Sequence, residues 1–75
     1  MSVKCLNTLD LGDIAIIKGF EDTPRLQSRL MEMGVLPGEK VRMIKKTPFH
    51  GPLEVKIRSF HLSLRWEDAS NILVS

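Results

Sequence analysis

The side chains in this sequence that could bind a transition metal are one cysteine and two histidines, Cys5, His50 and His61. Their separations of 45 and 11 residues match no spacing typical of a zinc or iron site. We expect His61 on the outer face of a strand opposite Lys56, whose positive charge disfavours a metal ion. Cys5 precedes any predicted regular structure and His50 lies in a loop. Both are therefore only weak candidates for binding ferrous iron or another transition metal.

Groups for acid–base or nucleophilic catalysis are no better organised. The nine carboxylates are scattered, and the neighbouring pairs Glu21-Asp22 and Glu67-Asp68 lie near predicted helix starts, where capping and the helix dipole explain them. No Ser-His-Asp or Cys-His set can be argued, and the five glycines form no phosphate-binding loop. A chain of 75 residues also has little core in which to shelter a catalytic cleft. We expect neither enzymatic activity nor a bound cofactor.

Basic residues gather in the second half of the chain, although the formal net charge is only +2. If the strand predicted over residues 39–46 runs straight, Lys40, Arg42, Ile44 and Lys46 share its outer face, and Lys56 and Arg58 extend this stripe onto the next strand. The stripe is interpreted as a solvated sheet face, a site for an acidic protein partner, or a nucleic-acid site. With one Trp, three Phe and no Tyr, stacking residues are few, and no nucleic-acid partner is expected.

These side chains must be positioned by a few short elements. Strands are predicted over residues 14–20, 39–46, 53–57, 60–64 and 72–74, with a loop rich in Pro and Gly over residues 47–52 and a short helical turn over residues 66–69. Five short strands and one helix in so short a chain predict a mainly β fold, a small closed SH3-like barrel. An OB-fold is the alternative, although it usually needs more residues.

The strongest local pattern is a hairpin formed by the third and fourth of these strands. A two-residue turn at Arg58-Ser59 would place every apolar residue of the hairpin on one face. It would pair Ile57 with Phe60, Val55 with Leu62, and Leu53 with Leu64.

The helix is predicted over about residues 24–33. Thr23 would be its N-cap, Pro24 its first residue, and Gly34 the left-handed residue that ends it. The spacing of apolar side chains gives one buried stripe, formed by Leu26, Leu30 and Met33. The opposite, solvated face carries Arg25 and Arg29, and Met31 lies off the buried stripe.

Composition and length favour one domain over residues 1–75. A single cysteine excludes an internal disulfide, no apolar run is long enough to span a membrane, and no signal peptide is recognised. We therefore expect a cytoplasmic protein without a membrane span. Small barrels often pair through an edge strand, and the sequence neither requires nor excludes such a homo-oligomer.

Several segments together resemble the FeoA family of ferrous iron transport accessory proteins. They are Leu11-Gly12, residues 29–38 (RLMEMGVLPG), residues 48–53 (PFHGPL), and Leu62-Ser63-Leu64-Arg65 followed by Ala69, Ile72 and Val74. The resemblance covers about residues 6–75. It implies an SH3-like barrel with an inserted helix, no enzymatic activity, and a cytoplasmic protein that acts with the membrane ferrous transporter FeoB, which carries a GTP-binding domain.

Two departures from the family pattern are visible. Ser59 stands in the hairpin turn where the family commonly has Gly, which would strain the backbone if that position needs a positive φ. His50 stands in a loop where small residues are usual.

From the resemblance and the charge pattern we predict an adaptor that binds the cytosolic side of a FeoB-type transporter and modulates iron uptake. The predicted contact surface is the exposed helix face with loop residues expected to adjoin it: Arg25, Arg29, Met31, Leu36, Phe49 and His50. Two alternatives belong to other classes. One is a nucleic-acid-binding barrel that uses Lys40, Arg42, Lys46, Lys56 and Arg58, and the other is a metal sensor that uses Cys5 or His50.

Overall fold

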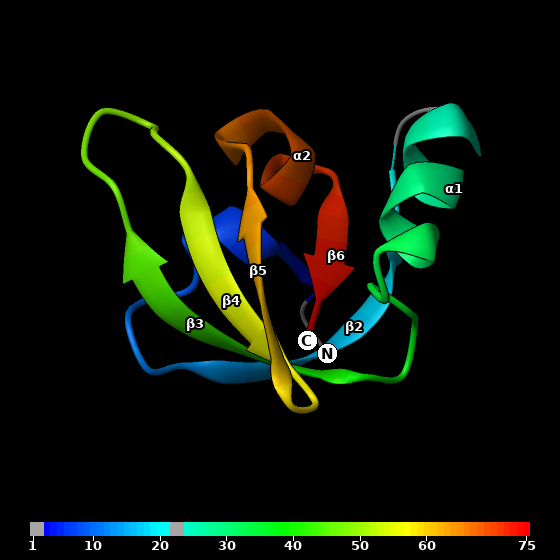
Figure 1. Cartoon of the computed structure of the whole chain (residues 1–75), viewed down its shortest axis with the longest axis horizontal. Helices are drawn as coiled ribbons and strands as arrows, with labels where there is room; N and C mark the ends of the chain where they lie inside the picture. Colours follow the sequence, from blue (N-terminus) through cyan, green and yellow to red (C-terminus); the bar gives the residue numbers. More distant parts are fainter. Residues whose placement is uncertain (1–2, 22–23) are drawn as a thin grey trace.

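Six strands form one strongly curved antiparallel sheet in the computed structural model, which describes residues 3–21 and 24–75 (Figure 1). The strand order is β1-β6-β2-β3-β4-β5. In chain order the elements are β1 (Lys4–Cys5), η1 (a 3₁₀ helix, Leu6–Thr8), β2 (Ile14–Phe20), α1 (Pro24–Glu32), β3 (Lys40–Lys46), β4 (Leu53–Ile57), β5 (Phe60–Leu64), α2 (Trp66–Ser70) and β6 (Ile72–Val74). The predicted mainly β class and its five strands are confirmed, and β1 is an additional strand.

The hairpin β4–β5 has the predicted register. Leu53 pairs with Leu64, Val55 with Leu62 and Ile57 with Phe60. The three β4 residues of these pairs and Leu64 are buried, because alternation turns them all toward the core.

The backbone strain considered at Ser59 does not arise at that position. The residue with positive φ in the hairpin turn is Arg58, at 56°. A two-residue hairpin turn can place its left-handed residue first, so a serine in second place is compatible with this turn.

The N-terminal strand corrects the expectation for Cys5, which does not precede all regular structure. Cys5 pairs with Leu73 of β6, and Lys4 pairs with Val74. The Cys5 side chain is half-buried. A strand of two residues is too short to show an alternation, so the sequence carries no pattern that predicts it.

Helix α1 begins at Pro24, as predicted, whereas the predicted N-cap Thr23 lies outside the described residues. Leu30 is fully buried, and Leu26 and Met33 pack against the core from its edge. Gly34 then adopts a φ of +96°, which ends the helix as expected. A Cβ at Gly34 would lie 2.6 Å from Cζ of Phe60, so the absence of a side chain also allows this turn to approach β5 closely.

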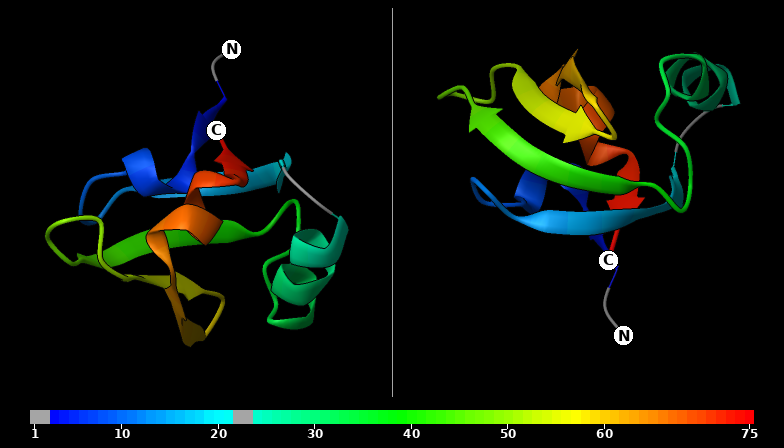
Figure 2. Two further views of the ribbon diagram at one scale, coloured as in Figure 1. Left: turned by 90° about the horizontal axis from the view of Figure 1, so that it is seen from above. Right: turned by 60° about the horizontal axis from the view of Figure 1, so that its bottom comes forward.

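The core lies inside the curve of the sheet and is closed by η1, α1 and α2 (Figure 2). Its large, fully buried side chains come from the N-terminal segment, from α1 and from four of the strands: Leu6, Leu9, Ile17, Leu30, Met43, Leu53, Ile57 and Ile72. Neither helix in the described ranges has the length and hydrophobicity needed to cross a bilayer.

Candidate functional site

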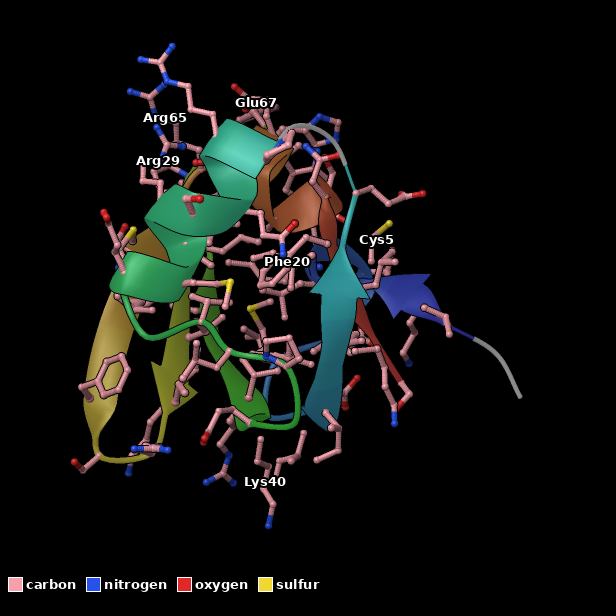
Figure 3. All side chains as sticks on the ribbon, turned by 90° about the vertical axis from the view of Figure 1, so that its right-hand side faces the viewer. Cys5, Phe20, Arg29, Lys40, Arg65 and Glu67 are labelled. Atoms are coloured by element: carbon pink, nitrogen blue, oxygen red, sulfur yellow. The ribbon has the colours of Figure 1, made fainter. Side chains whose placement is uncertain are left out.

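The short helix α2 connects two groups of candidate residues that come from distant parts of the chain. On one side, Nη2 of Arg29 in α1 donates a hydrogen bond of 2.9 Å to Oδ2 of Asp68 in α2. Figure 3 shows Arg29 beside Arg65 at the end of the molecule where Glu67 of α2 also lies. The ion pair links α1 to α2 and neutralises one of the two arginines predicted on the exposed helix face.

On its other side, α2 contacts the loop over residues 47–52 through Trp66. The imidazole of His50 stacks on the Trp66 indole with ring centroids 4.2 Å apart and an interplanar angle of 4°. Nζ of Lys46 lies 5.9 Å from the centre of the same indole, within range of a cation–π attraction. These contacts restrict the loop at its centre.

This loop carries unusual backbone conformations at its tip. Phe49 and His50 have φ values of 60° and 59°, a left-handed region that side chains other than Gly and Asn rarely adopt. Two hydrogen bonds close the loop, from N of Thr47 to O of Pro52 at 3.2 Å and from N of Gly51 to O of Pro48 at 3.3 Å. The Phe49 ring at this tip is fully exposed to solvent. Residues held in such strained conformations cluster at binding and active sites.

We call the surface formed by these groups the helical face. It comprises Arg25, Arg29, Phe49, His50, Trp66 and Asp68. Arg25 is exposed on α1, one turn before Arg29. The surface therefore combines an exposed aromatic ring, a stacked aromatic pair and arginine side chains.

The predicted contact residues do not adjoin one another as expected. The loop with Phe49 and His50 lies on one side of α2, and α1 lies on the other (Figures 1 and 2). Met31 is exposed on α1, where Nε2 of Gln27 donates a hydrogen bond of 3.9 Å to its sulfur. Leu36 is half-buried in the turn after α1, where its carbonyl accepts a hydrogen bond from N of Glu39, so it does not belong to the helical face.

Sequence reasoning missed Trp66 and Asp68 as members of this surface. Both lie in the short helical turn that was predicted, and Asp68 was explained there by capping and the helix dipole. The sequence feature that could have indicated this surface is Trp66, the only tryptophan of the chain, in an otherwise polar segment.

The structure gives no metal cluster to the weak candidates Cys5 and His50. Across residues 3–21 and 24–75, no group of three or more His, Cys, Asp or Glu side chains could hold a metal ion. The His50 ring is stacked on Trp66. His61 lies opposite Lys56 as predicted, with its Nδ1 3.9 Å from Oε2 of Glu54.

The predicted basic stripe is shorter than expected because β3 is not straight. The register of β3 against β4 shifts between Met43 and Lys45, which indicates a β-bulge. As a result Lys46 turns inward, and its Nζ donates hydrogen bonds to O of Asn7 at 3.3 Å and to O of Leu9 at 2.9 Å. The placement of Lys46 on the outer face is therefore wrong.

Of the predicted stripe, Lys40, Arg42, Lys56 and Arg58 stay exposed together, and with Ile14 they form what we call the basic sheet face; Ile44 is also exposed, as predicted, but does not line this surface. At its edge, Nε and Nη2 of Arg58 donate hydrogen bonds of 3.0 and 2.7 Å to the two carboxylate oxygens of Glu39. These hydrogen bonds lower the pKa of Glu39 below its usual value of 4.5 and raise the pKa of Arg58. Figure 3 shows Lys40 at the end of the molecule opposite Arg29.

Comparison with known proteins identifies one family. The model of the FeoA domain matches residues 4–75. A fusion protein from Porphyromonas gingivalis that joins Fe(2+) transport protein A to the Fe(2+) transporter FeoB is 33% identical over 69 residues, which cover 92% of this chain. The matched region is only 8% of that relative's length.

Solved structures share the fold over almost the whole chain. A FeoA-like protein from Clostridium acetobutylicum superposes with a TM-score of 0.89 at 25% identity, covering 100% of this chain and 87% of that protein. FeoA from Stenotrophomonas maltophilia in complex with zinc, described as a prokaryotic SH3 domain protein with a suggested role in activating ferrous iron transport, has a TM-score of 0.82 at 31% identity and coverages of 95% and 88%. The predicted SH3-like fold is thus confirmed.

Proposed function

Because the chain belongs to the FeoA domain family, we propose that it is a cytoplasmic, single-domain accessory protein that binds the cytosolic side of a FeoB-type transporter and modulates ferrous iron uptake. The FeoA domain is a non-enzymatic accessory domain associated with ferrous iron transport. The prediction that the chain is not an enzyme is therefore confirmed.

The observation that carries the proposal is the relative in which this domain and FeoB form one chain. A covalent link keeps two modules at a high effective concentration, which is useful when they must contact one another. In a chain that is separate from its transporter, the same contact has to be made by a surface with enough affinity of its own.

The helical face has the chemistry for such a contact. Aromatic and arginine side chains dominate the binding energy of most protein interfaces. Phe49 is fully exposed at the tip of a loop that the His50–Trp66 stack restrains. A restrained loop loses little conformational entropy when it binds, so its exposed ring contributes more to affinity than a ring on a mobile loop would.

The proposal is tested by measuring how the purified chain binds the cytosolic domain of a cognate FeoB-type transporter, with GTP and GDP analogues compared. We expect affinity to differ between the two nucleotide states. Phe49→Ala and the double variant Arg25→Glu/Arg29→Glu should each reduce affinity by about tenfold or more.

A matched control is the double variant Lys4→Glu/Lys18→Glu, which makes the same charge change at two exposed lysines of β1 and β2. It should bind like the unmodified chain. Circular dichroism checks that each variant is folded. Normal binding and normal iron uptake by a folded Arg25→Glu/Arg29→Glu variant would contradict a role for the helical face.

A further inference from the structure

The basic sheet face contains a row of side chains that crosses four strands. Ile14 of β2 pairs with Arg42 of β3, Arg42 pairs with Lys56 of β4, and Lys56 pairs with His61 of β5. All four side chains are exposed. Two positive charges are therefore directly opposite each other across β3 and β4, an arrangement that destabilises a sheet.

No acidic side chain in the described ranges forms an ion pair with Arg42 or Lys56, although Glu54 lies on the same face, opposite Lys45 and 3.9 Å from Nδ1 of His61. Glu39, the acidic residue that lines this surface, has both carboxylate oxygens engaged by Arg58. Lys40, Arg42 and Lys56 form no ion pair among the described residues. Arg29, by contrast, is paired with Asp68.

The basic sheet face and Glu39 together line a shallow depression of about 300 Å³. Ile14 adds an apolar side chain that is 56% exposed. A concave surface with cationic walls and one apolar contact fits an extended chain that carries both carboxylates and an apolar side chain.

We propose that the basic sheet face binds an acidic segment of a protein partner, with carboxylates at Arg42 and Lys56 and an apolar side chain against Ile14. Charge complementarity selects this partner, because acidic groups would relieve the repulsion across β3 and β4. Nucleic acid fits less well, since no aromatic ring lines the depression to stack a base and Lys46 is turned away from it. The inference does not depend on the proposed function, because Lys40 and Arg29 lie at opposite ends of the molecule (Figure 3).

The test uses a fluorescent peptide of alternating Glu and Leu, with a Gln-Leu peptide of the same length as its neutral counterpart. Binding is measured by fluorescence anisotropy at low and at physiological ionic strength, and the contact is mapped by amide chemical-shift changes. We expect the Glu-Leu peptide to bind more tightly than the Gln-Leu peptide, with an affinity that falls as salt is added. Shift changes should centre on residues 14, 42 and 56.

Lys56→Glu should weaken binding of the Glu-Leu peptide by about tenfold, whereas Lys56→Arg should bind normally. Lys18→Glu makes the same charge change at an exposed lysine of β2 and should also bind normally. Equal losses in Lys56→Glu and Lys18→Glu would overturn the proposal, because the attraction would then be unspecific. Tighter binding of a mixed-sequence oligonucleotide or of phosphatidylserine vesicles than of the peptide would overturn it in favour of those partners.

Discussion

The helical face and the basic sheet face both carry arginine side chains, but they differ in how these charges are compensated. On the helical face Arg29 is paired with Asp68 from another element. On the sheet face Arg42 lies opposite Lys56 with no carboxylate between them. The first surface pairs one of its two arginines internally and presents an exposed ring at Phe49, whereas the second presents unpaired charge at Arg42 and Lys56. The comparison shows that one small barrel can display two surfaces of different chemistry at opposite ends of the molecule (Figure 3).

The largest effect is expected where the helical face is attached to the sheet. Gly34→Ala should lower the free energy of unfolding by about 3 kcal/mol, because Ala is strained at a φ of +96° and its Cβ would collide with the Phe60 ring. Urea denaturation measures the loss. Gly38→Ala is the matched control, since Gly38 has a φ of +90° but no atom within 4 Å of the added Cβ. Gly38→Ala should lower the free energy of unfolding by about 1 kcal/mol, from backbone strain alone. Equal losses would contradict a role for the contact with Phe60.

A substitution to glycine should act in opposite directions on the two faces. Phe49→Gly should raise the free energy of unfolding by about 1 kcal/mol, because it relieves a φ of 60° and removes a ring that buries nothing. Ile14→Gly, in an extended strand, should lower it by about 1 kcal/mol. Thermal denaturation of the two variants compares them directly. A destabilised Phe49→Gly variant would show that the ring supports the loop and is not maintained for binding.

Reversal of one charge sharpens the comparison further. Arg29→Glu should destabilise the chain by about 0.5 kcal/mol, since it replaces the ion pair with Asp68 by a repulsion. Lys56→Glu should stabilise it by about 0.5 kcal/mol, because the change removes the repulsion between Lys56 and Arg42 and places a carboxylate opposite Arg42. Both effects should shrink in high salt. If both variants shift the denaturation midpoint in the same direction, the two faces do not differ in charge compensation.

The smallest effect concerns the Arg58–Glu39 ion pair at the edge of the sheet face. The pKa of Glu39 is lowered from 4.5 by its hydrogen bonds to Arg58. A carboxyl with a lowered pKa in the folded state stabilises the fold above pH 4.5, and this contribution is lost as the pH falls through the lowered value. Arg58→Gln should return the pKa of Glu39 toward 4.5, measured by NMR titration of its carboxyl carbon. Arg29→Gln should leave that pKa unchanged. An unaltered titration in Arg58→Gln would contradict the assignment of the shift to this pair.

Local patterns predicted the parts of the fold that local rules determine. The register of β4 against β5 follows from alternation and a two-residue turn, and the structure reproduces each predicted pair. The end of α1 follows from Gly34, whose conformation few other residues tolerate. The basic sheet face was largely predictable for the same reason, because alternate residues of neighbouring strands share a side.

The parts that could not be predicted depend on contacts between distant segments. Arg29 and Asp68 are 39 positions apart, and no spacing rule links them. The bulge in β3 reverses the direction of Lys46, whose hydrogen bonds reach back to residues 37 and 39 positions earlier. Phe49 and His50 were expected beside α1 because sequence patterns do not reveal which side of α2 the loop occupies. Electrostatic compensation and loop placement are tertiary properties.

The pairing of β1 with β6 has a consequence for how the chain folds. Lys4 and Val74 are neighbours in the sheet although nearly the whole chain separates them, so their pairing closes the largest loop in the molecule. Closing so long a loop costs conformational entropy before the contacts between the two strands can form. This pairing is therefore slow. The β4–β5 hairpin needs no such closure. We expect β1 to dock last during refolding and to exchange its amide hydrogens first in the native state. A circular permutant that links the two ends and opens the chain at the Arg58-Ser59 turn would make this pairing local and fold faster.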